Sequence, residues 1–212
     1  MSRTVDNAYD YIYSAIANGH LLPGAHIPEE MISARLAVSR TPVREAIRRL
    51  QADGLVVITP NSGADVAFFG PQEIAETFRL RALLEGQAAE RAASRIAEAD
   101  LAELDCSVKS LAKTSAAHDD VFEATRLNAA FHIKIAEAAE SPRLLQLIRG
   151  LVRIPPALMH GGNWAERLLN APGHDEHARI VAALRARNGA LSRALMQAHI
   201  LAAQPAFRED QG

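Results

Sequence analysis

The segment SRTPVREAIRRL, residues Ser39–Leu50, is the most informative part of this 212-residue chain. Its apolar side chains are spaced four and three residues apart, as on one face of a helix: Val43, Ile47 and Leu50. Arg40 and Arg44 stand near the start of the same helix, on its outer side. We therefore expect a helix that packs on its neighbours through one face and offers arginines to a partner through the other.

The flanking segments make this helix the third of a series. Apolar spacing predicts helices over Thr4–Asn18, Pro28–Leu36 and Arg40–Asp53. Thr4 and Ser39 are the expected N-caps, and Gly19 and Gly54 are the expected stops. Two β-like runs follow, at Leu55–Ile58 and Ala64–Ala67. The order of three helices and a hairpin is typical of a winged helix-turn-helix.

The N-terminal end of the third predicted helix carries side chains suited to contacting DNA bases and phosphates. An arginine there can hold O6 and N7 of guanine with two hydrogen bonds, a contact worth about 1–3 kcal/mol of base discrimination. The hydroxyls of Ser39 and Thr41 suit phosphate oxygens. Arg48 and Arg49 are better placed for backbone phosphates or for solvent. The plain alternative is a solvated amphipathic helix with ordinary surface arginines, and the order of the surrounding elements argues against it.

The first third of the chain resembles the GntR superfamily of bacterial regulators. The resemblance rests on four stretches: Leu21–Gly24, Arg35–Leu50, Gly54–Val56 and Pro60–Ala64. It implies a homodimer on palindromic double-stranded operator DNA, with the tip of the wing near the minor groove. The DNA-contacting residues that we expect are Arg35, Ser39, Arg40, Thr41, Arg44, Arg49 and Gly63, with Arg40 and Arg44 on the bases.

Two positions depart from the pattern of that superfamily. Members often carry an arginine where this chain has Glu30, so one phosphate contact is expected to be missing. The turn before the third helix commonly has a glycine where this chain has Ala37. Alanine is tolerable there if the residue stays helical.

The chain beyond Phe68–Pro71 is expected to be helical throughout. Helical segments are predicted at 71–94, 98–116, 118–139, 142–160, 173–187 and 189–204. Pro155 and Pro156 interrupt the fourth segment and should kink or split it. The expected fold is mainly α, with a winged helix-turn-helix over residues 1–68 and an all-α antiparallel bundle of six or seven helices over residues 69–212.

Three histidines and an asparagine fall on apolar faces of the predicted bundle: Asn128, His132, His177 and His199. Neutral imidazole is a good ligand for zinc, nickel, iron or manganese, and an amide oxygen is a weaker one. The alternative for each histidine is a buried side chain paired with a protein acceptor. His174 could compete with His177, whereas His118 and His160 are expected at the surface.

This arrangement resembles the FCD type of effector domain found in GntR regulators. The motif Arg79–Glu85 extends the resemblance over nearly the whole chain, and the six predicted helices point to the VanR-like subgroup. The resemblance implies a divalent metal held by an acid and three histidines, with the carboxylate of a small organic acid completing the coordination. The acid is usually aspartate, and Asn128 stands there.

The expected partners of the effector carboxylate are three arginines: Arg81, Arg149 and Arg153. The alternative is that each forms an ordinary ion pair. Arg81 and Glu85, in particular, are i, i+4 partners that can bind each other.

Composition narrows the class of protein further. A net charge of −2 excludes a non-specific nucleic-acid binder, and five arginines between positions 35 and 49 concentrate the positive charge in one segment of the chain. The single cysteine excludes an intrachain disulfide, and no apolar run is long enough for a signal peptide or a membrane span. We expect a cytoplasmic protein.

Three functions fit these residues. The first is a ligand-responsive DNA-binding regulator, a repressor that senses a metal ion and an organic acid. The second is a metal-dependent enzyme, which would need a general base near the metal. Glu176 is a poor candidate for that base, because it would point about 100° away from the neighbouring His177 on a helix. The third is a DNA-binding protein without a sensor, in which the histidines are structural.

Overall fold

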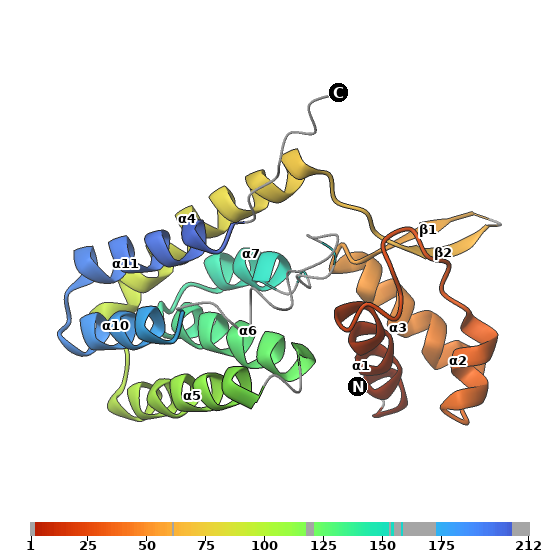
Figure 1. Ribbon diagram of the computed structural model, residues 1–212, viewed down its shortest axis with the longest axis horizontal. Coiled ribbons are helices and arrows are strands. Elements are labelled where there is room, and N and C mark those ends of the chain that lie inside the picture. Colours follow the sequence, from red (N-terminus) through yellow and green to blue (C-terminus); the bar gives the residue numbers. More distant parts are fainter. Residues whose placement is uncertain are drawn as a thin grey trace. The chain divides into compact units, whose positions relative to one another are not determined.

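The computed structural model describes residues 3–60, 62–117, 121–152, 154, 158 and 173–204. The chain divides into two compact units between Phe69 and Gly70, and each is described by itself. The first unit holds three helices and a hairpin, and the second holds helices only (Figure 1). The predicted fold class, a winged helix-turn-helix followed by a helical domain, is therefore confirmed.

The first unit has the predicted order of elements. Its helices are α1 Arg3–Ala17, α2 Glu29–Arg35 and α3 Arg40–Ala52, followed by the strands β1 Val56–Thr59 and β2 Gly63–Val66. The strands pair antiparallel, with Val56 opposite Val66. The predicted N-cap Thr4 is wrong, because α1 already includes Arg3. The apolar faces of α1 and α3 meet in a core that contains Ile12, Ile16, Ile47 and Leu50.

The turn between α2 and α3 corrects one expectation. Ala37 has a φ of +51° and is left-handed, not helical. The backbone N–H of Ala37 donates to the carbonyl of Ala34, and that of Val38 donates to the carbonyl of Ser33. This pair of bonds closes α2 as a Schellman motif, whose penultimate residue is left-handed and is usually glycine. Alanine is retained there against the steric preference of its Cβ.

Ala37→Gly should therefore stabilise the protein. A left-handed conformation costs a residue with a Cβ about 1–2 kcal/mol, and glycine avoids this cost. Part of the gain is offset, because glycine makes the unfolded chain more flexible and so loses more conformational entropy on folding. We expect a net gain of about 0.5–1 kcal/mol in a urea or thermal unfolding experiment. The matched control is Ala34→Gly on the same short helix, which should destabilise by about 1 kcal/mol. Destabilisation by both variants would contradict the left-handed assignment.

The second unit is a bundle of helices in the described ranges of the chain. These are α4 Pro71–Ala93, α5 Glu98–Ala117, α6 Val121–Ala138, α7 Pro142–Val152, α10 Gly173–Arg185 and α11 Gly189–Ala202. Helix α7 ends earlier than predicted, at Val152, three residues before Pro155. None of the helices described is long and apolar enough to cross a membrane.

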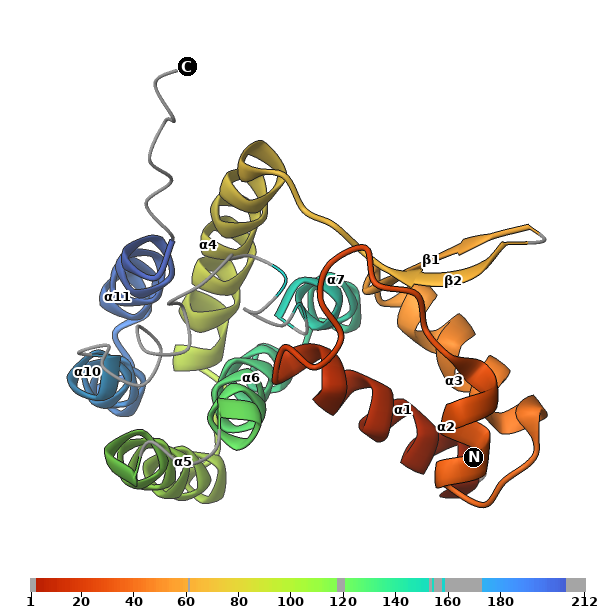
Figure 2. The ribbon, with the colours of Figure 1, turned by 45° about the vertical axis from the view of Figure 1, so that its right-hand side comes forward.

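Close packing of α4 and α11 organises this bundle. The two helices lie side by side in Figures 1 and 2. Small side chains on α4, such as Ala89 and Ala92, are buried. A Cβ added to Gly86 would lie 2.7 Å from Cγ of Gln197 on α11, so only glycine permits this approach. Helices α6 and α10 complete the core around Phe131 and Ile180.

Candidate DNA-reading surface and buried histidine site

The N-terminal end of α3 is open to solvent. Ser39 occupies the N-cap position with an extended backbone, and its side chain makes no capping hydrogen bond. Its hydroxyl and the first N–H groups of the helix are therefore available to an anion such as a phosphate oxygen. Five side chains expected on DNA are exposed: Arg35, Ser39, Arg40, Thr41 and Arg44.

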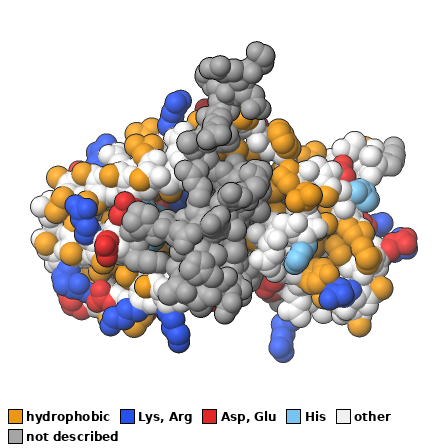
Figure 3. All heavy atoms as spheres, in the orientation of Figure 1, with side chains coloured by type: hydrophobic (Ala, Val, Ile, Leu, Met, Phe, Trp, Pro, Cys, Tyr) orange, Lys and Arg blue, Asp and Glu red, His pale blue; other side chains and the backbone are white. Residues whose placement is uncertain are grey.

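Two of these arginines already have acidic partners. Arg40 forms an ion pair with Glu30, and Nε of Arg44 donates to Oε2 of Glu29 at 2.8 Å. Both acids belong to the first turn of α2. Acidic and basic side chains accordingly lie next to one another on this unit (Figure 3).

Arg49 and Gly63 have roles inside the fold. Nη1 of Arg49 donates to Oδ1 of Asp6 at 2.7 Å, and its guanidinium lies 4.8 Å from the centre of the Tyr9 ring, so it ties α3 to α1. The structure does not place Arg49 with the other expected DNA contacts. At Gly63 φ is +97°, and an added Cβ would lie 2.6 Å from Cε1 of His26. The packing of His26 requires glycine there independently of any DNA.

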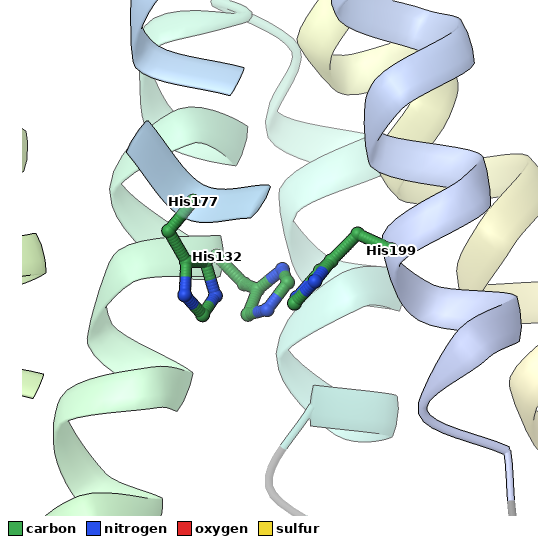
Figure 4. A group of neighbouring side chains, drawn as sticks. All are labelled: His132, His177 and His199. Carbon is green, nitrogen blue, oxygen red and sulfur yellow. The ribbon is translucent and has the colours of Figure 1, made fainter. Parts of the chain in front are cut away.

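Three buried histidines converge in the second unit. His132 on α6, His177 on α10 and His199 on α11 are 2%, 5% and 8% exposed. One ring nitrogen of each lies within 4.8 Å of the others. Figure 4 shows the three rings side by side, brought together from three helices. The spacing of these residues on apolar faces predicted this cluster.

The sequence did not reveal the acids that contact these rings. Oε2 of Glu85 on α4 lies 2.6 Å from Nδ1 of His132, and Oε2 of Glu176 lies 2.8 Å from Nδ1 of His199. Glu176 comes from α10, one residue before His177, and reaches His199 on α11.

Arg81 is occupied by Glu85. Its Nε donates to Oε1 of Glu85 at 2.8 Å, and both side chains are buried, so the i, i+4 pair predicted as the alternative for Arg81 is confirmed. Burial raises the pKa of Glu85, but the charges of Arg81 and His132, with their hydrogen bonds, outweigh it and hold the pKa at about 2. A buried, permanently ionised carboxylate therefore stands behind His132.

The other candidate residues differ in their positions. Arg149 is exposed on α7 and donates to Oε1 of Glu137 at 2.7 Å, which corrects its expected place in the effector cavity. Arg153 lies outside the described residues, as do the side chains of His118, His160 and His174. Asn128 is half-buried on α6, one turn before His132.

The protonation of the cluster suits a metal ligand set. Burial and the neighbouring His132 lower the pKa of His199 to about 4, although Glu176 opposes this, so His199 is neutral near pH 7. A carboxylate can only accept a hydrogen bond, so Glu176 fixes the ring proton of His199 on Nδ1 and leaves Nε2 as the free donor atom of that ring. Within the described part of the chain, Nε2 of His132 is buried without a hydrogen-bond partner.

Buried polar atoms of native proteins are nearly always paired, so an orphaned imidazole nitrogen calls for a ligand. Three buried imidazoles with carboxylates behind two of them form the donor set of a first-row divalent cation. The residues present therefore fit such an ion.

Comparisons with known proteins agree with both units. The family model "Bacterial regulatory proteins, gntR family" matches residues 4–66, and the FCD domain model matches residues 76–202. The transcriptional regulator YdhC of Bacillus subtilis is 30% identical over 90% of this chain and 85% of its own length. The transcriptional repressor GlaR of Escherichia coli is 27% identical over 99% of this chain and 98% of its own length.

A solved structure shares the fold. That of E. coli McbR/YncC superposes with a TM-score of 0.77 at 23% identity, covering 95% of each chain. Both proteins thus have a winged helix-turn-helix followed by a helical bundle.

Proposed function

Since this chain belongs to the bacterial gntR family and carries an FCD domain, we propose that it is a transcriptional repressor whose buried histidine site binds a divalent metal ion and a small organic acid. Its relatives are transcriptional regulators and not enzymes, which removes the metalloenzyme alternative. The observation that carries the sensing role is the convergence of His132, His177 and His199 from three helices.

The metal would be held by Nε2 of His132 and His199 and by a ring nitrogen of His177. Zinc, nickel, iron or manganese suits these ligands, and the ion would supply a positive charge to attract a carboxylate. Asn128 lies on the same helix as His132, and its neutral amide adds no negative charge to the site. Histidine ligands bring no negative charge of their own to the ion, which favours an anionic effector.

On the DNA, we propose that Arg40 and Arg44 read bases and that Arg35, Ser39 and Thr41 contact phosphates. All five side chains are exposed. A homodimer would present two copies of this set to a palindromic operator, whose half-sites need a set separation. An effector that binds one arrangement of the dimer more tightly would shift the population toward it and change operator affinity.

Metal analysis of the purified full chain tests the sensing role. We expect about one divalent ion per chain after dialysis, because a buried three-histidine set binds such ions tightly. The third function, a DNA-binding protein with structural histidines, would instead leave the dialysed chain free of metal after exposure to zinc, nickel, iron or manganese.

Glu176→Ala should weaken zinc binding about tenfold. Its carboxylate accepts from Nδ1 of His199, and loss of a hydrogen-bonded partner behind a ligand costs roughly 10–100-fold in affinity. Competition against a fluorescent zinc chelator measures the change. The matched control is Asp175→Ala, which removes an exposed carboxylate one residue away and should leave zinc affinity within about twofold. Equal zinc affinity in the two variants would exclude this role for Glu176.

A further inference from the structure

Two adjacent acids share a cleft with the arginines expected to read bases. The cleft lies within the first unit and has a volume of about 450 Å³. Its lining includes Glu29 and Glu30 from α2, and Arg40 and Arg44 from α3. Acids in the first turn of α2 are favoured by the helix dipole, but that effect does not direct their carboxylates toward α3.

The two ion pairs engage different nitrogens. Glu29 accepts from Nε of Arg44, the nitrogen nearest the aliphatic stem. Glu30 accepts from Nη2 of Arg40, a terminal nitrogen. The difference matters because the terminal edge of the guanidinium can hold O6 and N7 of guanine with two parallel N–H groups. Among the residues that the structure describes, Glu29 leaves both terminal nitrogens of Arg44 free, whereas Glu30 occupies one of those of Arg40.

The two acids also differ in how firmly they are held. The side chain of Glu29 is 26% exposed and that of Glu30 is 74% exposed. Glu29 is therefore packed into the cleft, where it can fix the direction of Arg44 before DNA arrives. Glu30 projects into solvent and is free to swing away, and its charge faces the same region as an incoming phosphate backbone.

We propose that these neighbours act in opposite directions: Glu29 positions Arg44 to read guanine, and Glu30 competes with DNA for Arg40. This inference rests on the proposed reading role of the two arginines. A fixed guanidinium loses less side-chain entropy on binding, which strengthens the contact with the correct base. A displaced ion pair weakens binding to every sequence alike.

The test uses the full chain and two fluorescent duplexes. One is the tightest-binding duplex that the wild-type chain selects from a random-sequence pool, and the other is a scrambled duplex of the same composition. Fluorescence anisotropy gives Kd for Glu29→Gln and Glu30→Gln. Glu76→Gln, an exposed acid on α4 in the other unit, is the control with the same change in net charge. Thermal melting checks that the three variants are folded.

Glu29→Gln should weaken the selected duplex about fivefold and leave the scrambled duplex unchanged, because only base reading is impaired. A second selection with this variant should show a reduced preference for guanine at one position of each half-site. A merely structural role for Glu29 would weaken both duplexes together and leave the base preference intact, which would overturn the proposal for Glu29.

Glu30→Gln should tighten both duplexes about threefold at 50 mM salt. The gain should shrink at 300 mM salt, where exposed charges are screened. An unchanged or weaker affinity, or an equal gain in Glu76→Gln, would overturn the competing role of Glu30. If Arg40→Ala and Arg44→Ala both bind the selected duplex as the wild type does, the reading role itself fails; if those lose binding while the glutamine variants match the wild type, only this inference fails.

Discussion

Arg40→Ala should lose specific operator binding while the protein stays folded. A bidentate arginine–guanine contact is worth about 1–3 kcal/mol, which corresponds to roughly 5–150-fold in Kd for each half-site. In a dimer both half-sites lose the contact, so the selected duplex should be bound at least about 25-fold more weakly. The side chain is exposed and pairs with the exposed Glu30, so its removal should change the free energy of unfolding by less than about 1 kcal/mol.

Arg48→Ala provides the control for this result. Arg48 is exposed on the same helix, two turns further along, and is expected on phosphates or solvent. Its removal should weaken the selected and scrambled duplexes by the same small factor. Anisotropy titrations with both duplexes measure the two variants. An Arg40→Ala chain that keeps its preference for the selected duplex would remove Arg40 from the reading residues.

His177→Ala should abolish stoichiometric metal binding. Two imidazoles remain in this variant, and a two-nitrogen set holds a divalent ion far more weakly than three convergent ligands. Zinc content after dialysis should fall from about one ion per chain to near zero. Zinc that binds the native state alone should also raise its melting temperature, and this shift should vanish in the variant.

A control and a second variant separate loss of the metal ligand from loss of folding. His20→Ala removes an exposed histidine from the first unit and should leave the zinc content unchanged. His177 is buried, and its ring lies 4.5 Å from that of Phe131, so alanine leaves a cavity. His177→Gln fills more of that space and should lose zinc equally. Full zinc occupancy in both folded variants would transfer the ligand role to another residue, with His174 as the first candidate.

Periodic features were visible in the sequence. The apolar spacing of α3 and the histidines on the inner faces of α6, α10 and α11 depend on the helical repeat, which is local. The order of three helices and a hairpin then defined the first unit, and the three histidines converge because each lies on an apolar, core-facing side.

Contacts between distant elements could not be predicted in this way. Glu85 and His132 are 47 positions apart and meet only when α4 packs on α6. Arg149 shares the basic chemistry of an effector ligand, but α7 turns it to the surface beside Glu137. The Arg81–Glu85 pair was predicted, but its burial was not. The missed signal is that both residues stand on the same side of α4 as Phe78 and Ala82, where charged residues rarely lie without a function.

The left-handed conformation of Ala37 was also outside the reach of sequence patterns. Alanine has the highest helix propensity, so its local preference indicates a helical turn. The Schellman closure of α2 overrides that preference, because the chain must reverse direction before α3 begins.

The central claim is that the histidine site controls DNA binding, and one titration tests it most directly. The metal-loaded full chain is titrated onto the selected duplex in the presence of lactate, succinate or citrate, each as a separate probe, and the series is repeated with His177→Ala. Our account predicts that at least one of these acids changes the Kd of the wild-type chain tenfold or more and leaves that of the variant unchanged. The same Kd in every acid for the wild-type chain, or the same response in the variant, would contradict it.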